Sequence, residues 1–239
     1  MTPLVLVHGF MGGSDQWGPQ KNLAADLKLI RLDLPGYGRA ADQNAIASID
    51  GMARWALDHL ADMGIRTFDL LGHSMGGMVV QEMVRQEPER IRKLILYATG
   101  PTGVLPDRFE PIETSIARAT ADGAETTARR IAATWFLDEQ SVDDNAGCLD
   151  LAARSGLPAI LAGLEAMRGW SGEDYLSEIA ADTLVIWGDQ DRTYGWPQVE
   201  QLWMTIPNSH LAVLPLCAHA IHLEKPKFFN AILMDFLSK

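Results

Sequence analysis

Residues 68–77 read FDLLGHSMGG, and this stretch decides the fold. It joins a short apolar run to the pattern Gly-x-Ser-x-Gly, and an apolar helical pattern follows at 78–80. In this pattern a strand ends in a sharp, strained turn that projects the serine hydroxyl above a sheet, and a helix begins directly after it. Gly72 and Gly76 leave room for backbones to approach. We therefore expect Ser74 at a helix N-terminus, where free N–H groups and the helix dipole favour developing negative charge.

Short apolar runs rich in Val, Ile and Leu lie on both sides of this turn and alternate with helical patterns. Such continuous runs suit strands that are buried on both faces of a parallel sheet. We expect an α/β fold with a mostly parallel, doubly wound sheet of about six strands. The expected strands are 4–7, 27–32, 68–71, 94–97, 184–187 and 211–214, and the expected helices are about 14–26, 48–63, 75–87, 196–206 and 225–238.

The segment 101–179 breaks this alternation. It is rich in alanine, contains no convincing strand, and places Ile112, Ile116 and Ala119 at helical spacing. The sequence therefore predicts one core domain with an inserted helical lid, or cap. The expected division is 1–100 for the first part of the core, 101–179 for the lid, and 180–239 for the second part of the core.

Composition and charge exclude several classes of function. The formal net charge is −11, and no run rich in Lys or Arg offsets it, so we expect no nucleic-acid partner. No stretch approaches the roughly 20 apolar residues of a membrane helix, and no secretory signal pattern is visible, which predicts a cytoplasmic protein with no membrane partner. Cys148 and Cys217 are far apart and in no CxxC pattern, so we expect neither a redox motif nor a thiolate metal site. The sequence does not determine the oligomeric state.

A serine hydroxyl is a poor nucleophile until a base takes its proton, and that base needs an orienting carboxylate. The sequence supplies both types of residue downstream, in the order acid and then histidine. The turn 188–191, GDQD, follows an apolar run and offers Asp189 and Asp191. The segment 219–222, HAIH, follows the last expected strand and offers His219 and His222. The residues alone leave both choices open.

The negative charge that forms on an attacked carbonyl oxygen needs two N–H donors. One is the backbone N–H after the nucleophile, here Met75, and the other comes from the loop after the first core strand. That loop is 8–13, HGFMGG, and we predict Phe10 as the second donor. Both are main-chain groups, so their side chains matter little for this role.

The chain resembles the α/β-hydrolase fold superfamily, in its esterase, lactonase and haloperoxidase-like branch. The resemblance covers nearly all of the chain outside the lid, and together its motifs are specific for the fold. In that family the acid occupies the last position of the G-x-x-D turn, and the base is the first histidine of an H-x-x-H-L-E-like segment. The resemblance therefore implies Asp191 and His219. It rests on His8-Gly9-Phe10, on 33–38, DLPGYG, on the serine turn, on 188–191, and on 219–226, HAIHLEKP.

Two side chains are interpreted through the same resemblance. His8 is expected to brace the oxyanion loop rather than to act as a second base. Ala218 departs from the pattern, because the family often has Gly before the catalytic histidine; this costs backbone freedom but removes no chemical group.

The resemblance implies a serine hydrolase that cleaves a small, hydrophobic carboxylic ester through an acyl-enzyme, with no cofactor. Lactone or enol-lactone hydrolysis uses the same machinery and is the closest alternative. Carbon–carbon bond hydrolases rank third, because Phe10 and Ala220 stand where those enzymes usually have Ser and Trp. A non-catalytic ligand-binding protein of this fold is the alternative from another class.

Candidate residues of the substrate pocket follow no motif. His73 flanks the nucleophile and either lines the pocket or packs. About half of the lid aromatics are expected to face the site, since an aromatic at helical spacing is more often core. A metal site is not expected, because His219 and His222 have no third ligand at helpful spacing apart from Glu224. We assign His73 to the pocket, together with three of the lid aromatics, Trp135, Phe136 and Trp170. The other lid aromatics are Phe109 and Tyr175.

Overall fold

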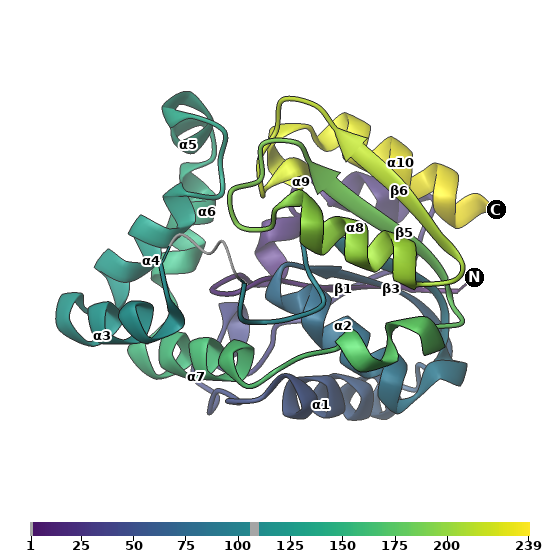
Figure 1. Cartoon of the computed structure of the whole chain (residues 1–239), viewed down its shortest axis with the longest axis horizontal. Helices are drawn as coiled ribbons and strands as arrows, with labels where there is room; N and C mark the ends of the chain where they lie inside the picture. The colour runs from purple at the N-terminus through teal and green to yellow at the C-terminus, as the bar shows by residue number, and fades with distance from the viewer. Residues whose placement is uncertain (1, 106–109) are drawn as a thin grey trace.

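The structure is a computed structural model, and it describes residues 2–105 and 110–239. Its centre is one six-stranded sheet in the order β2-β1-β3-β4-β5-β6, in which every neighbouring pair is parallel (Figure 1). The prediction of a parallel sheet of about six strands is confirmed. The strands are β1 (Leu4–Val7), β2 (Leu29–Arg31), β3 (Phe68–His73), β4 (Ile91–Tyr97), β5 (Asp182–Gly188) and β6 (Ser209–Leu214).

Helices cover both faces of the sheet, which explains why the central strands β1, β3 and β4 are buried along almost their whole length. Successive side chains of a strand point to opposite faces. Val5 and Val7 of β1 therefore belong to a different hydrophobic cluster from Leu4 and Leu6. The first cluster contains residues of α1 (Ile49–Asp62), α2 (Met75–Gln86) and α8 (Trp196–Thr205), and the second contains residues of α10 (Pro226–Ser238).

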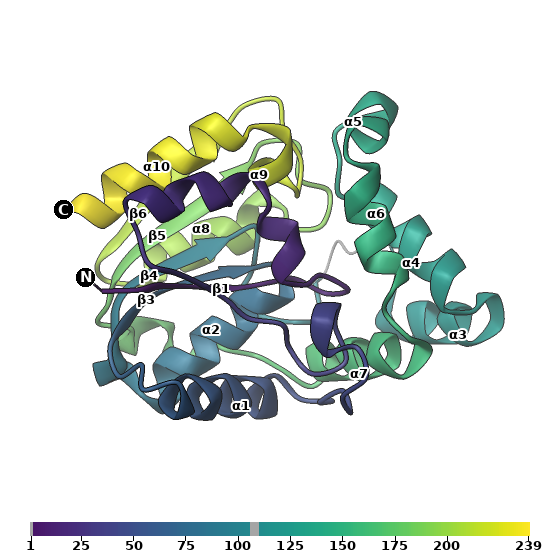
Figure 2. The ribbon, with the colours of Figure 1, turned by 180° about the vertical axis from the view of Figure 1, so that it is seen from behind.

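The N-terminal segment differs from the prediction of one helix over 14–26. The structure has two short 3-10 helices there, Ser14–Trp17 and Pro19–Ala25. Gly18 lies between them and Pro19 begins the second, and proline has no N–H to continue a helical ladder. Trp17 and Leu23 of these turns pack in the same cluster as α10, and Figure 2 shows the two segments side by side.

Among the described residues, five α-helices lie between β4 and β5, and we call residues 101–179 the helical insert. They stand as a group at one end of the sheet, on the side of the carboxyl ends of the strands (Figure 1). An isolated antiparallel bridge between Thr102 and Ser171 joins the beginning of the insert to its end. The helical character is as expected, whereas the role of a lid stays a prediction. The helices are α3 (Ile112–Asp122), α4 (Ala124–Ala133), α5 (Glu139–Asp144), α6 (Ala146–Ala153) and α7 (Leu157–Arg168).

Within the described ranges, no single helix is long and apolar enough to cross a membrane. One bent pair of insert helices, α6 with α7, meets the criterion by length and composition only.

Candidate active site

Ser74 is the single residue between β3 and α2. Its φ of 56° and ψ of −121° lie outside the regions that a residue with a side chain normally adopts. Three hydrogen bonds hold this strained backbone. The N–H of Ser74 donates to the main-chain carbonyl oxygen of Tyr97, and the carbonyl of Ser74 accepts from the N–H of Gly77 and the hydroxyl of Thr99. Strain of this kind persists only where the surroundings over-determine it, and it concentrates at functional sites. The strand, turn and helix predicted around Ser74 are present as expected.

Two glycines of the turn are required by contact. A Cβ on Gly72 would lie 2.3 Å from the carbonyl oxygen of Gly76, and a Cβ on Gly76 would lie 2.4 Å from the carbonyl oxygen of His8. These distances are far below van der Waals contact with rigid backbone. The spacing of the motif therefore reflects how closely β1, β3 and α2 approach one another.

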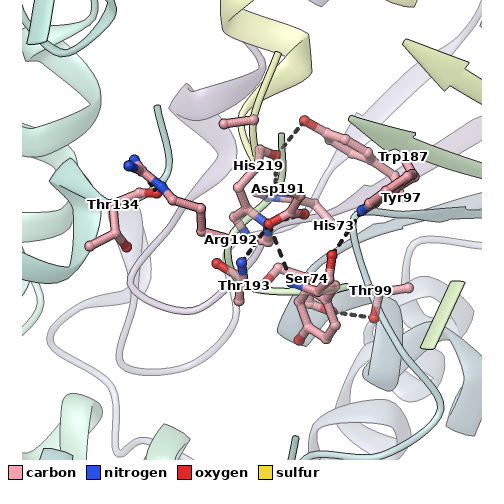
Figure 3. A network of polar contacts seen from close by, with 12 residues as sticks. His73, Ser74, Tyr97, Thr99, Thr134, Trp187, Asp191, Arg192, Thr193 and His219 are labelled. Atoms are coloured by element: carbon pink, nitrogen blue, oxygen red, sulfur yellow. Dashed lines mark hydrogen bonds and ion pairs between the residues drawn. The ribbon is translucent and has the colours of Figure 1, made fainter. Parts of the chain in front are cut away.

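Asp191 and His219 form a buried pair at the carboxyl edge of the sheet (Figure 3). The Nδ1 atom of His219 lies 2.9 Å from Oδ2 of Asp191, and neither side chain is more than 1% exposed. A carboxylate only accepts hydrogen bonds, so Nδ1 carries the proton and Nε2 is left free to act as a base. The other carboxylate oxygen of Asp191 accepts from the N–H groups of Thr193 and Tyr194.

The competing acid and the competing histidine are used elsewhere. Oδ1 of Asp189 accepts a 2.7 Å hydrogen bond from the N–H of Leu216, in the loop after β6. His222 is buried, and its Nδ1 lies 2.9 Å from the hydroxyl of Tyr97. Burial lowers the pKa of His222 to about 3 and so keeps it neutral. Of the four side chains left open by the residues, the structure thus brings together the two that the family resemblance favoured.

The Ser74 hydroxyl is not bonded to the pair of Asp191 and His219. In the part of the chain that the structure describes, no hydrogen bond joins it to His219. The adjoining side chain, His73, has its ring centroid 4.7 Å from that of His219, so the two loops are in contact. Catalytic hydrogen bonds are often long or poorly aligned without substrate and tighten when it binds. The pair of Asp191 and His219 is thus formed, and the hydrogen bond between Ser74 and His219 stays a prediction.

The loop that contains Phe10 lies against the serine turn. A Cβ on Gly9 would be 3.1 Å from Cβ of Ser74. His8 fixes the loop, because its Nδ1 donates to the oxygen of Gly9 at 2.8 Å and its Nε2 accepts from the N–H of Leu34 at 3.0 Å. Burial lowers its pKa, in keeping with this neutral tautomer. These two hydrogen bonds fit the bracing role that the resemblance implied for His8, and Phe10 and Met75 as oxyanion donors stay a prediction.

His73 packs beneath the catalytic loop, which is the second of the two roles left open by the sequence. Its Nδ1 accepts from the side-chain amide of Gln16, and its Nε2 donates to the main-chain oxygen of His219, both at 3.2 Å. Its ring stacks on that of Tyr97, with centroids 4.6 Å apart. Burial and, to a smaller degree, the neighbouring histidines hold its pKa well below the usual value. We therefore no longer assign His73 to the substrate pocket.

Sequence reasoning missed Tyr97, which connects these groups. Its hydroxyl lies 2.9 Å from both the main-chain oxygen of His219 and Nδ1 of His222, and it accepts from the N–H of His222 at 3.2 Å. Tyr97 ends the apolar stretch 94–97, which we interpreted only as a buried strand. The signal that could have found it is its phenol, which stands at the carboxyl end of the expected strand 94–97, the next strand in the chain after the one that leads to Ser74.

The aromatic residues that we assigned to the pocket lie in different surroundings. The Trp135 ring lies 6.3 Å from that of His219, so it stands beside the expected base. Phe136 is fully buried and lines a cavity of about 630 Å³ together with Arg192, Thr134 and Val142, whereas neither Ser74 nor His219 lines it. Phe109 lies outside the described residues.

Trp170 is not brought to the site. Its indole N–H donates to Glu82, which also accepts from the hydroxyl of Tyr175. Glu82 follows Ser74 by eight residues, and a helical rise of 1.5 Å per residue places it about 12 Å along α2. Both aromatics therefore anchor the end of the insert to the core. Among the described residues, no group of three or more His, Cys, Asp or Glu could hold a metal ion.

Comparisons with known proteins identify the family of the chain. Residues 4–232 match the model of the alpha/beta hydrolase family. A putative carbamate hydrolase, RutD, of Rhizobium rhizogenes is 27% identical over 243 residues, which are 98% of this chain and 92% of the relative. A pimeloyl-[acyl-carrier protein] methyl ester esterase of Aeromonas salmonicida is 27% identical over 243 residues, covering 98% of this chain and 94% of the relative.

Among solved structures, the enol-lactonase from Burkholderia xenovorans LB400 superposes with a TM-score of 0.91 at 20% identity. The match covers 100% of this chain and 92% of the enol-lactonase chain. At this level of identity the likeness concerns the fold.

Proposed function

The chain belongs to the alpha/beta hydrolase family, and from this premise we propose that it cleaves a small, hydrophobic carboxylic ester with Ser74 as nucleophile. The observation that carries the proposal is the buried pair of His219 and Asp191, 2.9 Å apart, beside the strained serine turn. A histidine fixed in this tautomer by a carboxylate, next to a serine at a helix N-terminus, is the arrangement that nucleophilic catalysis requires.

The mechanism follows from these positions. Substrate binding brings the Ser74 oxygen within reach of Nε2 of His219, which takes the hydroxyl proton as the oxygen attacks the ester carbonyl. The N–H groups of Phe10 and Met75 donate to the oxyanion. His219 then gives its proton to the leaving alcohol, and an acyl-enzyme is left on Ser74. Water attacks this ester by the same proton route, which releases the carboxylic acid and restores the serine.

The surroundings of the base support a hydrophobic substrate. The rings of Trp135 and Tyr194 lie 6.3 Å and 5.8 Å from that of His219, and Tyr194 is nearly parallel to it. The net charge of −11 disfavours anionic substrates over long range. The Aeromonas relative is named for a methyl ester, which agrees with an ester as the scissile group. Lactone opening uses the same steps with a tethered alcohol, so both substrate classes belong in the test.

The test is hydrolysis of p-nitrophenyl esters of increasing acyl length beside a panel of lactones, with wild type and Ser74→Ala. We expect short to medium esters to be cleaved and Ser74→Ala to lose at least about a thousandfold in kcat. The matched control is Ser238→Ala, an exposed serine at the end of α10. A fluorophosphonate should add one phosphonyl group to wild type and none to Ser74→Ala. Near wild-type turnover in Ser74→Ala refutes the mechanism, and a wild type that the probe does not label supports a non-catalytic binding protein.

A further inference from the structure

Four consecutive residues of the helical insert, Thr134 to Leu137, lie across the two loops that carry Asp191 and His219. They connect α4 to α5 and belong to neither helix. Each of the four uses a main-chain group to bond with one of these loops or with the short helix α9 (Ile221–Glu224) that follows His219. The carbonyl oxygens of Thr134 and Phe136 accept from Arg192, that of Trp135 accepts from the N–H of Ala220, and the N–H of Leu137 donates to Glu224.

Glu224 joins the insert directly to the loop of the base. Its Oε1 accepts from the N–H of Leu137 at 2.7 Å, and its Oε2 accepts from the N–H of Ala218 at 2.7 Å. Ala218 is the residue before His219. Hydrogen bonds to a charged oxygen are roughly twice as strong as those between neutral groups. A single carboxylate therefore fixes the distance between the insert and the backbone of His219.

Arg192 provides the second attachment, from the loop of the acid. It directly follows Asp191, and its guanidinium donates to the main-chain oxygen of Phe136 at 2.6 Å and to that of Thr134 at 3.3 Å. Figure 3 shows Arg192 beside Thr134. Both bonds start from one nitrogen, Nη2, whose two N–H groups are fixed in the guanidinium plane, whereas the three donors of a lysine ammonium rotate. Trp135 lies between these two carbonyl groups in the chain, so its indole is placed beside His219 by attachments on both sides.

We propose that Glu224 and Arg192 are positioning residues, which hold Trp135 and the backbone of His219 in one fixed arrangement. The inference rests on the proposed hydrolase function. Its physical basis is that a misplacement of about 1 Å at a reacting group can cost about a hundredfold in rate. Both act through the main chain of the insert around Trp135 and, for Glu224, through the N–H of Ala218.

The test compares Glu224→Gln and Arg192→Lys with the matched controls Glu200→Gln and Arg66→Lys, two exposed residues away from this contact. Glutamine keeps one acceptor oxygen but turns an N–H₂ group towards the second N–H, so one of the two bonds is lost. We expect kcat/KM for the preferred ester to fall about tenfold or more in both variants, and the controls to stay within twofold. The second-order rate of fluorophosphonate labelling at Ser74 should fall in parallel.

Two further measurements separate positioning from a merely structural role. In hydrogen exchange, the amides of Leu137 and Ala218 should lose protection in Glu224→Gln while those of β3 and β4 keep theirs. In a double-mutant cycle, Trp135→Ala should remove most of the KM effect of Arg192→Lys, because both changes act on the same wall of the site. Additive effects on KM would contradict this part of the proposal.

The outcomes are distinguishable from failure of the proposed function. If the wild type hydrolyses esters and its Ser74 is labelled, but both variants keep kcat and KM within twofold, the positioning role is overturned. If the wild type is neither active nor labelled, the proposed function fails first and the positioning role fails with it. A loss of kcat/KM in folded variants, with normal controls, supports both.

Discussion

The hydroxyl of Tyr97 donates a 2.9 Å hydrogen bond to the main-chain oxygen of His219, the residue whose side chain we assign as the base. Tyr97 ends β4 and is paired in register with His73 of β3, which donates to the same oxygen. The strand that carries the nucleophile and its neighbour therefore hold the backbone of the base. Two buried donors on one carbonyl limit how far His219 can move relative to Ser74.

Tyr97→Phe tests this attachment. The ring and its stacking on His73 are kept, whereas the N–H of His222 loses its acceptor and the oxygen of His219 loses one donor. We expect the free energy of unfolding to fall by about 1–3 kcal/mol, since a buried polar group is left without a partner. We also expect kcat to fall severalfold. Urea unfolding and ester kinetics measure the two effects.

The control is Tyr175→Phe, which removes a hydrogen bond to Glu82 on the core side of the insert. It should lower stability and leave kcat unchanged. Equal kcat values in the two variants would show that Tyr97 stabilises the fold without positioning the base.

The assignment of the acid is tested by Asp191→Asn beside Asp189→Asn. Asparagine at 191 can turn an amide N–H towards Nδ1 of His219, which favours the wrong tautomer of the imidazole. In a serine protease, this change of the triad acid lowers kcat about 10⁴-fold, and we expect a loss of similar order here. Asparagine at 189 keeps an oxygen for the N–H of Leu216, so kcat should change less than fivefold, by about the effect of one weakened hydrogen bond. The reverse ranking of the two variants would move the role to Asp189.

Stability should fall in mild acid because of three buried histidines, His8, His73 and His222. Their pKa values are lowered in the folded protein, that of His222 to about 3, chiefly by burial. The unfolded chain therefore binds more protons below about pH 6.5, the ordinary value for histidine, and this favours unfolding. The contribution of each neutral histidine is fully present above that pH and is lost progressively as the pH falls towards its folded pKa.

His222→Gln measures how much His222 contributes to this pH dependence of stability. Each such histidine contributes a slope of up to about 1.4 kcal/mol per pH unit, so the variant should have a shallower dependence between pH 6.5 and 4.5. Urea unfolding at a series of pH values gives the slopes. His59→Gln, at an exposed position of α1, should keep the wild-type slope. An unchanged slope in His222→Gln would mean that His222 is charged or exposed in the folded state.

Gly163→Ala tests how the insert is docked on the oxyanion loop. A Cβ on Gly163 of α7 would lie 2.3 Å from the hydroxyl of Tyr37 and 2.7 Å from the ring of Phe10. Alanine in a helix is normally favoured over glycine by about 1 kcal/mol, but here a methyl group must displace two buried aromatic rings. We expect lower stability and lower kcat, because Phe10 also provides an expected oxyanion donor.

Gly147→Ala is the matched control, since nothing lies within 4 Å of a Cβ at that position of α6. It should leave kcat unchanged and keep or raise stability. Thermal unfolding compares the stability of the two variants, and ester kinetics compare their kcat values. A Gly163→Ala protein as active and as stable as the control would show that α7 moves freely over Phe10.

The sequence by itself determined the parts of the protein that are local. The serine turn, the six strands and the helices 49–62, 75–86, 196–205 and 226–238 follow from glycine spacing and from apolar periodicity, which act within a few residues. The expected helix over 14–26 failed for an equally local reason, the glycine and proline at 18 and 19.

The tertiary structure decided which side chains meet. Asp191 and His219 are 28 residues apart in the chain, and apart from the family resemblance nothing in either segment distinguishes them from Asp189 and His222. Likewise, only the packed fold shows that His73 lies under the catalytic loop, that Trp170 bonds with Glu82, and that Glu224 joins the insert to the base. The physical reason is that these contacts depend on distances across strands and on the burial of polar groups. Both quantities exist only once the sheet and the insert have come together.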